Sequence, residues 1–181
     1  NKLNLDPDQV LLDDLNPFIK LRKTTGEIRL RDFQYKILMS TLVTRKKLCD
    51  FRIIDDPSCL SCVEENVIVN DNIRHSFFEC PISRNTWENV KTVLLNNYEF
   101  QFEINEINCI LGVQCRSKKV TEINELLIII RKTMHAPVKK RKLLMCNEIA
   151  SIFDNRKKVN NLLKVKKHNE QVRKLTRNNL G

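Results

Sequence analysis

The sequence is poor in the two residues that most often interrupt regular structure, because its 181 residues include only 3 glycines and 5 prolines. Glycine and proline mark turns and end helices, so this scarcity predicts few turns and a mostly helical fold. The sequence also lacks a run of 18 apolar residues, the length at which a membrane-spanning helix is indicated, and we therefore expect no membrane partner. A hydrophobic fraction of 41% is typical of a globular chain with its own core.

The number of cysteines is odd. The sequence has 7 cysteines, whereas a small secreted domain held by disulfides usually has an even number. Cys59 and Cys62 are two residues apart, and His75 and Cys80 follow closely. This clustering favours a reducing compartment in which the thiols are free to bind metal. The remaining cysteines are expected to fill apolar space, and only the first of them is a competitor for a ligand position: Cys49, Cys109, Cys115 and Cys146.

The clustered residues have the spacing C-x2-C-x12-H-x4-C. Two residues between the first two cysteines let both sulfurs face one ion, and the second pair can complete a tetrahedron. Four nitrogen and sulfur ligands are typical of a closed structural zinc site, whereas a catalytic zinc keeps one position for water. The sequence therefore predicts one structural zinc ion bound by Cys59, Cys62, His75 and Cys80. The alternatives are a metal-free buried cluster and a catalytic zinc, for which no motif supplies a general base.

Charge is distributed unevenly along the chain, whose net charge is +10. Residues 49–97 carry 4 Lys and Arg against 8 Asp and Glu, or −4, whereas residues 131–181 carry 15 against 3, or +12. Basic side chains on helices neutralise phosphates, so we expect the last fifty residues to contact RNA or DNA. The alternative is a solvated helix face. The candidate contacts are Arg131, Lys132, Lys139, Lys140, Arg141, Lys142, Arg156, Lys157, Lys158, Lys164, Lys166, Lys167, Arg173 and Lys174.

Apolar residues that recur at helical spacing predict the secondary structure. Residues 18–29 are expected to be irregular, with a turn at Gly26. Trp87 and Phe77 lie on apolar stripes, so we expect them in the core rather than stacked on bases. His135 and His168 are isolated and are expected at a helix cap or on the surface. The predicted helices cover 6–15, 30–48, 81–97, 121–135 and 138–153, followed by a partly helical tail, and the second, third and fourth form the core.

Several motifs resemble those of a known family. The run Phe33-Gln34-Tyr35-Lys36-Ile37-Leu38 precedes Cys59-x-x-Cys62, then His75-Ser76-Phe77-Phe78-Glu79-Cys80, and finally Trp87. This series resembles the zinc-binding carboxyl-terminal domain of non-LTR retrotransposon reverse transcriptases. The motifs lie within residues 33–87, about a third of the chain. The departures are Met39, where a histidine is common, and the polar stretch 63–74, and neither affects a ligand.

The resemblance implies a piece of a longer, nuclear polypeptide that passes through the cytoplasm. The parent is implied to be an RNA-directed DNA polymerase with an endonuclease, which inserts itself by target-primed reverse transcription. This piece would help to hold template RNA, target DNA or both, and would pack against the reverse transcriptase portion. We expect no catalytic residues and no small-molecule substrate here, because Asp13-Asp14 and Asp55-Asp56 lack the strand-turn-strand setting of a polymerase site.

The expected organisation is a small helical domain built around one CCHC zinc knuckle, with a basic helical tail. A competing hypothesis is a protein-interaction scaffold that docks the parent polymerase or an acidic partner. The expected divisions are a linker at 1–29, a zinc-binding module at 30–97 and a basic helical region at 98–181.

Overall fold

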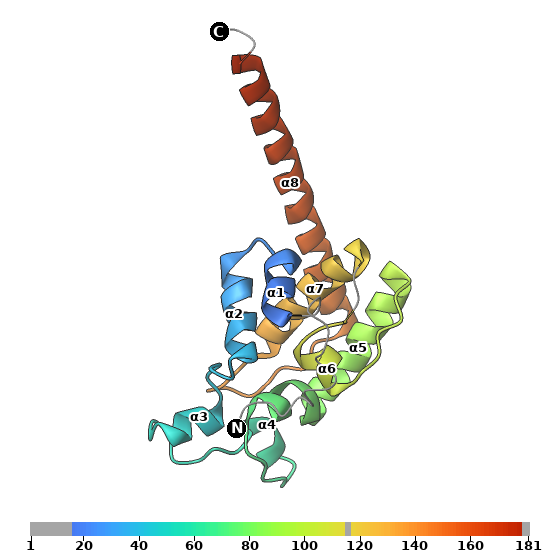
Figure 1. The fold of residues 1–181 in the computed structure, drawn as a ribbon. Helices are drawn as coiled ribbons and strands as arrows, with labels where there is room; N and C mark the ends of the chain where they lie inside the picture. Colours follow the sequence, from blue (N-terminus) through green and yellow to red (C-terminus); the bar gives the residue numbers. More distant parts are fainter. Residues whose placement is uncertain (1–15, 115–116, 179–181) are drawn as a thin grey trace.

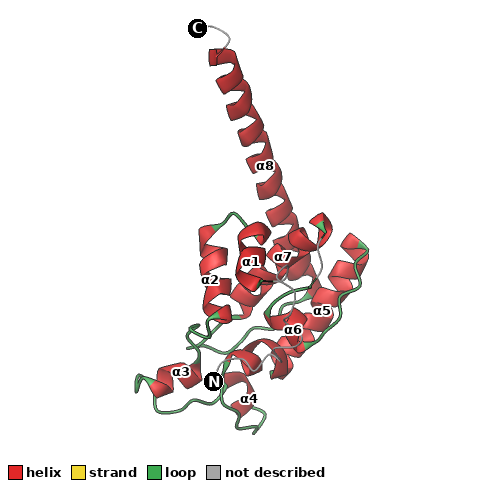
Figure 2. Ribbon diagram, in the orientation of Figure 1, coloured by secondary structure: helices red, strands yellow, loops and turns green. Residues whose placement is uncertain are grey.

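The computed structural model describes residues 16–114 and 117–178, and within these residues the regular structure is helical (Figures 1 and 2). An isolated antiparallel bridge joins Ser58 to Asn70. The expectation of a mostly helical fold is thus confirmed. None of the described helices is long and apolar enough to cross a membrane. In chain order the elements are α1 (Pro17–Thr24), α2 (Ile28–Leu38), α3 (Arg45–Asp50), α4 (Leu60–Val63), the π-helix η3 (His75–Glu79), α5 (Pro81–Tyr98), α6 (Glu106–Ile110), α7 (Lys118–Met134) and α8 (Cys146–Asn178).

The helices form a body from which one helix extends. α1 and α2 pack on each other and on α7, while α5 packs against the start of α8. The short helices α3 and α4 lie at one end of the body, and α8 extends from the other end (Figure 1).

A helix occupies the segment that was expected to be irregular. Pro17 is the first residue of α1, and the Asn16 side chain accepts the backbone N–H of Phe18 at 3.0 Å. Proline suits the first helical position because its ring presets φ and its missing N–H needs no partner there. The expectation that residues 18–29 are irregular was therefore wrong for most of this segment, whereas the turn expected at Gly26 is present between α1 and α2. The predicted helix at 6–15 lies outside the described residues.

The helix expected at 30–48 is two helices. α2 ends at Leu38, and Ser40 adopts a left-handed φ of 54°, donating its N–H to the carbonyl of Ile37. The chain becomes helical again after Thr44, whose hydroxyl accepts the N–H of Lys47 at 3.3 Å. A left-handed residue ends a helix, and a threonine N-cap begins one.

Of the three later predicted helices, one begins where predicted and two begin at a different residue. α5 begins at Pro81, as predicted. α7 begins before Thr121, because the side chain of Ser117 is the N-cap and accepts the N–H of Val120 at 3.0 Å. The helix predicted from residue 138 begins only at Cys146.

A single hydrophobic core holds the body together. It contains buried residues from Leu21 in α1 to Phe153 in α8. The core therefore crosses the expected divisions at residues 29 and 97. Its largest fully buried apolar side chains are those of Trp87, Phe77, Phe102, Phe153, Ile37, Leu94, Ile110, Ile123, Leu127, Ile130 and Met134.

Candidate metal centre

The first cysteine pair lies at a tight turn that leads into α4. Cys59 precedes the helix, and the N–H of Cys62 donates to the carbonyl of Cys59 at 3.1 Å. The N–H of Cys59 donates to the carbonyl of Val69 at 2.9 Å, and that of Val67 donates to Cys62 at 3.1 Å. These bonds fold residues 59–69 back on themselves, so both sulfurs face the interior.

The second pair is spaced by a π-helical turn. In η3 the N–H of Cys80 donates to the carbonyl of His75, five residues earlier, at 2.9 Å. The wider turn of a π-helix places residues five apart on one side, and such turns are frequent at functional sites. The Asn72 side chain fixes the start of the turn by accepting the N–H of His75 at 2.8 Å.

The four predicted ligand residues meet at one point. All are buried, and their ligand atoms lie within 4.8 Å of one another. Cys62 Sγ is 3.4 Å from His75 Nε2 and 4.0 Å from Cys80 Sγ. With ordinary zinc bond lengths, a tetrahedral site has sulfur–nitrogen and sulfur–sulfur edges of about 3.6 and 3.8 Å. The donor set and its spacing therefore fit a metal ion of this kind.

A basic side chain from far along the chain completes the surroundings of the cluster. Arg141 is buried, and its Nη1 donates to Cys59 Sγ at 2.9 Å and lies 3.7 Å from Cys80 Sγ. Its Nη2 is ion-paired with the buried carboxylate of Asp71 and donates to Ser76 Oγ at 2.7 Å. Ser76 Oγ donates in turn to Asp71 at 2.7 Å. The guanidinium thus contacts one sulfur from each of the two ligand pairs, Cys59–Cys62 and His75–Cys80.

The surroundings concentrate negative charge on one sulfur. Hydrogen bonding with Cys80 holds the pKa of the Cys59 thiol far below its usual value, and the same interaction raises the pKa of Cys80. Burial raises the pKa of Cys62. The thiolate is the form that binds metals, and it is favoured at the sulfur to which Arg141 donates.

Aromatic packing connects the metal cluster to the core. Trp87 is fully buried, and its Nε1 donates to the carbonyl of Phe77 at 2.6 Å. The rings of Phe77 and Phe33 meet edge to face at 6.3 Å. The His135 ring lies 5.8 Å from Phe33 and 6.2 Å from Phe77, at the end of α7. The prediction that Trp87 and Phe77 are core residues is confirmed.

Two of the cysteines outside the cluster fill apolar space as expected, whereas Cys49, which lies outside the hydrophobic core, does not. Cys109 is buried in the core, and Cys146 is partly buried beside it. The Cys49 thiol faces the carbonyl of Asp55 at 3.5 Å and does not join the metal cluster. Cys115 lies outside the described residues.

Three of the arginines expected to contact phosphate have internal partners instead. Arg131 is fully buried, where it donates to Gln34 Oε1 at 3.0 Å and to the carbonyl of Cys109 at 3.2 Å. Arg141 contacts the cysteine cluster, and the side chain of Arg156, 12% exposed, is ion-paired with acidic residues of the body. We correct the expectation for Arg131 and Arg141, because a buried guanidinium cannot reach a polynucleotide.

The described lysines of the candidate set are exposed. Lys140 pairs with Glu64 and Lys142 with Glu148, so these two are partly neutralised. The side chains of Lys167, Arg173, Lys174 and His168 lie outside the described part of α8. The exposed lysines are Lys132, Lys139, Lys140, Lys142, Lys157, Lys158, Lys164 and Lys166.

Sequence reasoning found the four ligand residues and missed the groups around them. Asp71 and Ser76 lie between the ligands in the sequence, but no spacing rule singles them out. Arg141 is 61 residues beyond Cys80 and stands in a run of four basic residues. No local signal distinguishes it from its solvent-exposed neighbours.

Comparisons with protein-family models, with curated proteins and with solved structures find no match to this chain. The resemblance to the retrotransposon domain therefore stays a prediction that rests on residues 33–87.

Proposed function

We propose that this chain is a zinc-stabilised nucleic-acid-binding domain that has no catalytic role of its own. Zinc is the structural ion, because three cysteines and a histidine form the closed four-ligand set that structural zinc sites use. The motif resemblance further supports a place at the carboxyl-terminal end of a retroelement reverse transcriptase. In that setting the domain holds template RNA, target DNA or both.

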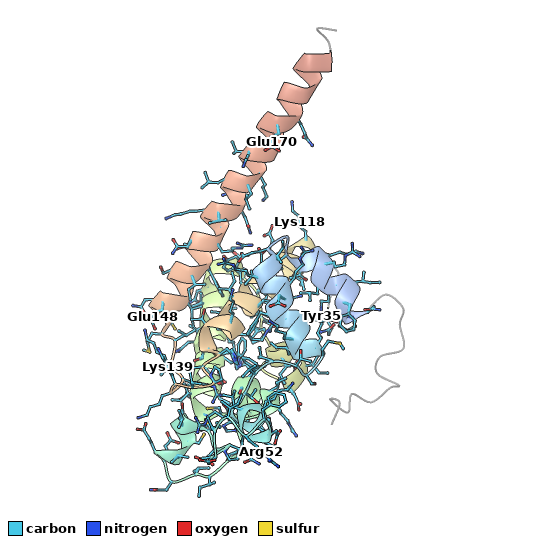
Figure 3. All side chains as sticks on the ribbon, turned by 90° about the vertical axis from the view of Figure 1, so that its left-hand side faces the viewer. Tyr35, Arg52, Lys118, Lys139, Glu148 and Glu170 are labelled. Atoms are coloured by element: carbon cyan, nitrogen blue, oxygen red, sulfur yellow. The ribbon has the colours of Figure 1, made fainter. Side chains whose placement is uncertain are left out.

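One observation carries the binding part of this proposal. Helix α8 extends beyond the body (Figure 1), and its Lys157, Lys158, Lys164 and Lys166 are exposed. Glu170, the last acidic residue in the sequence, is labelled on the extended part of the helix (Figure 3). A helix that exposes this many lysines can follow a phosphate backbone with little dependence on base sequence.

A second candidate function rests on apolar residues of the same helix. Leu162 is 70% exposed and Val165 is 58% exposed. Exposed apolar side chains on a basic helix also suit a scaffold that docks the parent polymerase or an acidic protein. The two functions differ in how binding to polynucleotide depends on salt.

A salt titration tests the nucleic-acid function. Substituting Lys157, Lys158, Lys164 and Lys166 by glutamine should weaken binding to RNA and DNA of any sequence. Each lost phosphate contact should reduce the slope of log affinity against log salt by about 0.7 for single strands and 0.9 for duplex DNA. The affinity of the wild type and the variant is measured by fluorescence anisotropy across a range of salt concentrations.

The matched control removes the same charge elsewhere. Substituting four exposed lysines of the body also changes the net charge from +10 to +6, since four positive charges are lost. If both variants reduce the slope equally, binding reflects net charge rather than α8. If the α8 variant binds like the wild type, the scaffold function replaces the proposed one. The control lysines are Lys23, Lys36, Lys91 and Lys118.

A further inference from the structure

Residues 136–145, which we call the strap, link α7 to α8 and lie along the metal-binding end of the body. Figure 3 labels Lys139 within the strap and Glu148 just beyond it. The backbone N–H of Arg141 donates to Ser61 Oγ at 3.0 Å, within the turn between the first two cysteines. The backbone N–H of Leu144, which is buried, donates to Thr86 Oγ1 at 3.3 Å. The strap is therefore bonded both to α4 and to α5.

The Arg141 guanidinium adds contacts to both halves of the metal cluster. It donates to Cys59 Sγ and lies within reach of Cys80 Sγ, two sulfurs that belong to segments 21 residues apart. Asp71 and Ser76 hold the other side of the same guanidinium. These contacts coexist only while the two ligand pairs lie together.

The net charge of the cysteine cluster with a zinc ion bound would also favour a cation at the position of Arg141. Three thiolates and one Zn²⁺ carry a net charge of −1, and an uncompensated charge in a buried setting is costly. A buried guanidinium beside two of the sulfurs supplies the opposite charge. Groups that donate to metal ligands orient them and strengthen metal binding.

We propose that Arg141 is a positioning residue for the metal site, and that the bound metal holds the strap closed over it. Because the ion keeps the two ligand pairs together, it preserves the contacts that bury Arg141. When the ion leaves, the pairs separate and the strap is released. Arg141, the buried member of the basic run 139–142, then becomes accessible together with the backbone of the strap, so the strap acts as a metal-dependent latch.

This inference rests on the proposed metal binding, and its test uses the full chain. Zinc affinity is measured by competition with a chromophoric chelator for the wild type, Arg141→Met and Arg141→Lys. The control is Lys139→Met, an exposed residue of the same strap. Arg141→Met should bind zinc about 10–100-fold more weakly, as other changes next to metal ligands do. Arg141→Lys keeps the charge but loses the two-nitrogen fork, and its affinity should lie between those of Arg141→Met and the wild type.

The state of the strap is measured separately by limited trypsin digestion at saturating zinc. Cleavage after Lys140 and Lys142 should be slow in the wild type and in Lys139→Met. It should be fast in Arg141→Met, and fast in the wild type once a chelator has removed the zinc. Trp87, the single tryptophan, reports folding, because its emission stays at short wavelength while it is buried.

The outcomes separate the two proposals. A folded, reduced wild-type chain without zinc overturns the metal site itself. A wild type that binds zinc, together with an Arg141→Met that matches Lys139→Met in affinity and cleavage, overturns the latch alone. If Trp87 emission shows that Arg141→Met is unfolded, the Arg141→Lys variant is used in its place. An Arg141→Lys variant with the zinc affinity and the cleavage rate of the wild type would then overturn the latch.

Discussion

At the scale of single residues, the metal cluster depends on side chains that bind no metal. Trp87 is the largest buried side chain, and its indole nitrogen donates to the carbonyl of Phe77 within η3. Its ring also lies 5.8 Å from that of Phe102. Trp87 therefore fixes the π-helical turn that carries two ligands to the core of the body.

Trp87→Ala should lower the free energy of unfolding by about 3–5 kcal/mol, the usual cost of removing a large buried aromatic side chain. Trp87→Phe should cost less, since it keeps most of the apolar ring and loses the hydrogen bond to Phe77. Urea denaturation followed by circular dichroism measures both. A Trp87→Ala variant as stable as the wild type would show that the side chain is not packed in the core, and would favour base stacking.

At the scale of elements, the sequence predicted a helix correctly where the residues that begin it and bury it lie within that helix. Pro81 and the stripe behind it predicted α5, because both the start and the buried face are encoded within one helix. The break at Ser40 was missed because an apolar pattern continued through it. The late start of α8 was missed because the basic residues before it resemble a helix face. In the structure the backbone N–H groups of Arg141 and Leu144 in this stretch donate to side chains of α4 and α5.

The residues of the metal centre also differ in how local their sequence signals are. Its ligands come in two pairs, each set by a turn of a few residues, so spacing alone identified them. Arg141 comes from the strap, and its role depends on how α7 and α5 are placed. Such a contact follows only from the tertiary fold, and composition even points the wrong way, toward a phosphate ligand.

The attachment of α8 to the body depends on a buried carboxylate. Glu125 of α7 accepts hydrogen bonds from Arg156 at 2.6 Å and from Asn160 at 2.9 Å, and Arg156 also pairs with Glu27. Burial alone raises the pKa of Glu125, but hydrogen bonds from Arg156, Thr25 and Asn160 outweigh burial and hold that pKa below its usual value. The ionised carboxylate thus stabilises the folded chain.

Glu125→Gln should lower the free energy of unfolding at pH 7 by about 1.5–3 kcal/mol, the range for hydrogen bonds to charged groups. Because the pKa of Glu125 in the folded chain lies below its usual value of 4.5, ionisation of this carboxyl stabilises the folded chain above pH 4.5. This stabilisation is lost as the pH falls through the folded-state pKa. The difference between wild type and variant should therefore shrink below pH 4.5. Urea denaturation at several pH values measures it, and zinc loss at low pH affects both proteins alike.

The control for this prediction is Glu122→Gln, which removes an exposed carboxylate one turn earlier in α7. An exposed position of this kind should change stability by at most about 0.5 kcal/mol. Equal effects of the two substitutions would show that Glu125 does not anchor α8.

At the scale of the whole molecule, the two ends differ in charge and in what holds them together. The segment 49–97 carries −4 and three thiolates with one Zn²⁺ would bring it to −5, whereas α8 is strongly basic. This separation directs a polyanion toward α8 and away from the metal end. The body between them is held by the hydrophobic core, but the metal end has little apolar burial of its own.

The metal end should consequently fold only with its ion. No residue of α3 is buried, and Phe51, Ile53 and Ile68 are more than 60% exposed. The hydrophobic cluster at the site itself consists of the three cysteines, with Ile82 packed against them. Apparent binding energies of structural zinc are about 10–16 kcal/mol, which is large compared with what so small a cluster gains by burial.

The wild type should hold one zinc ion per chain, and Cys59→Ser or His75→Ala should abolish zinc binding. In the variants, or after chelation, amide hydrogen exchange should become fast at residues 44–80. Exchange should stay slow in α5 and α7, because Val90, Leu94 and Ile123 remain packed in the core. Cys49→Ser, which changes a cysteine outside the cluster, should keep both the zinc and the slow exchange. Elemental analysis and exchange mass spectrometry measure these outcomes, and unchanged exchange at 44–80 after complete zinc removal would show that the metal is not what folds this end.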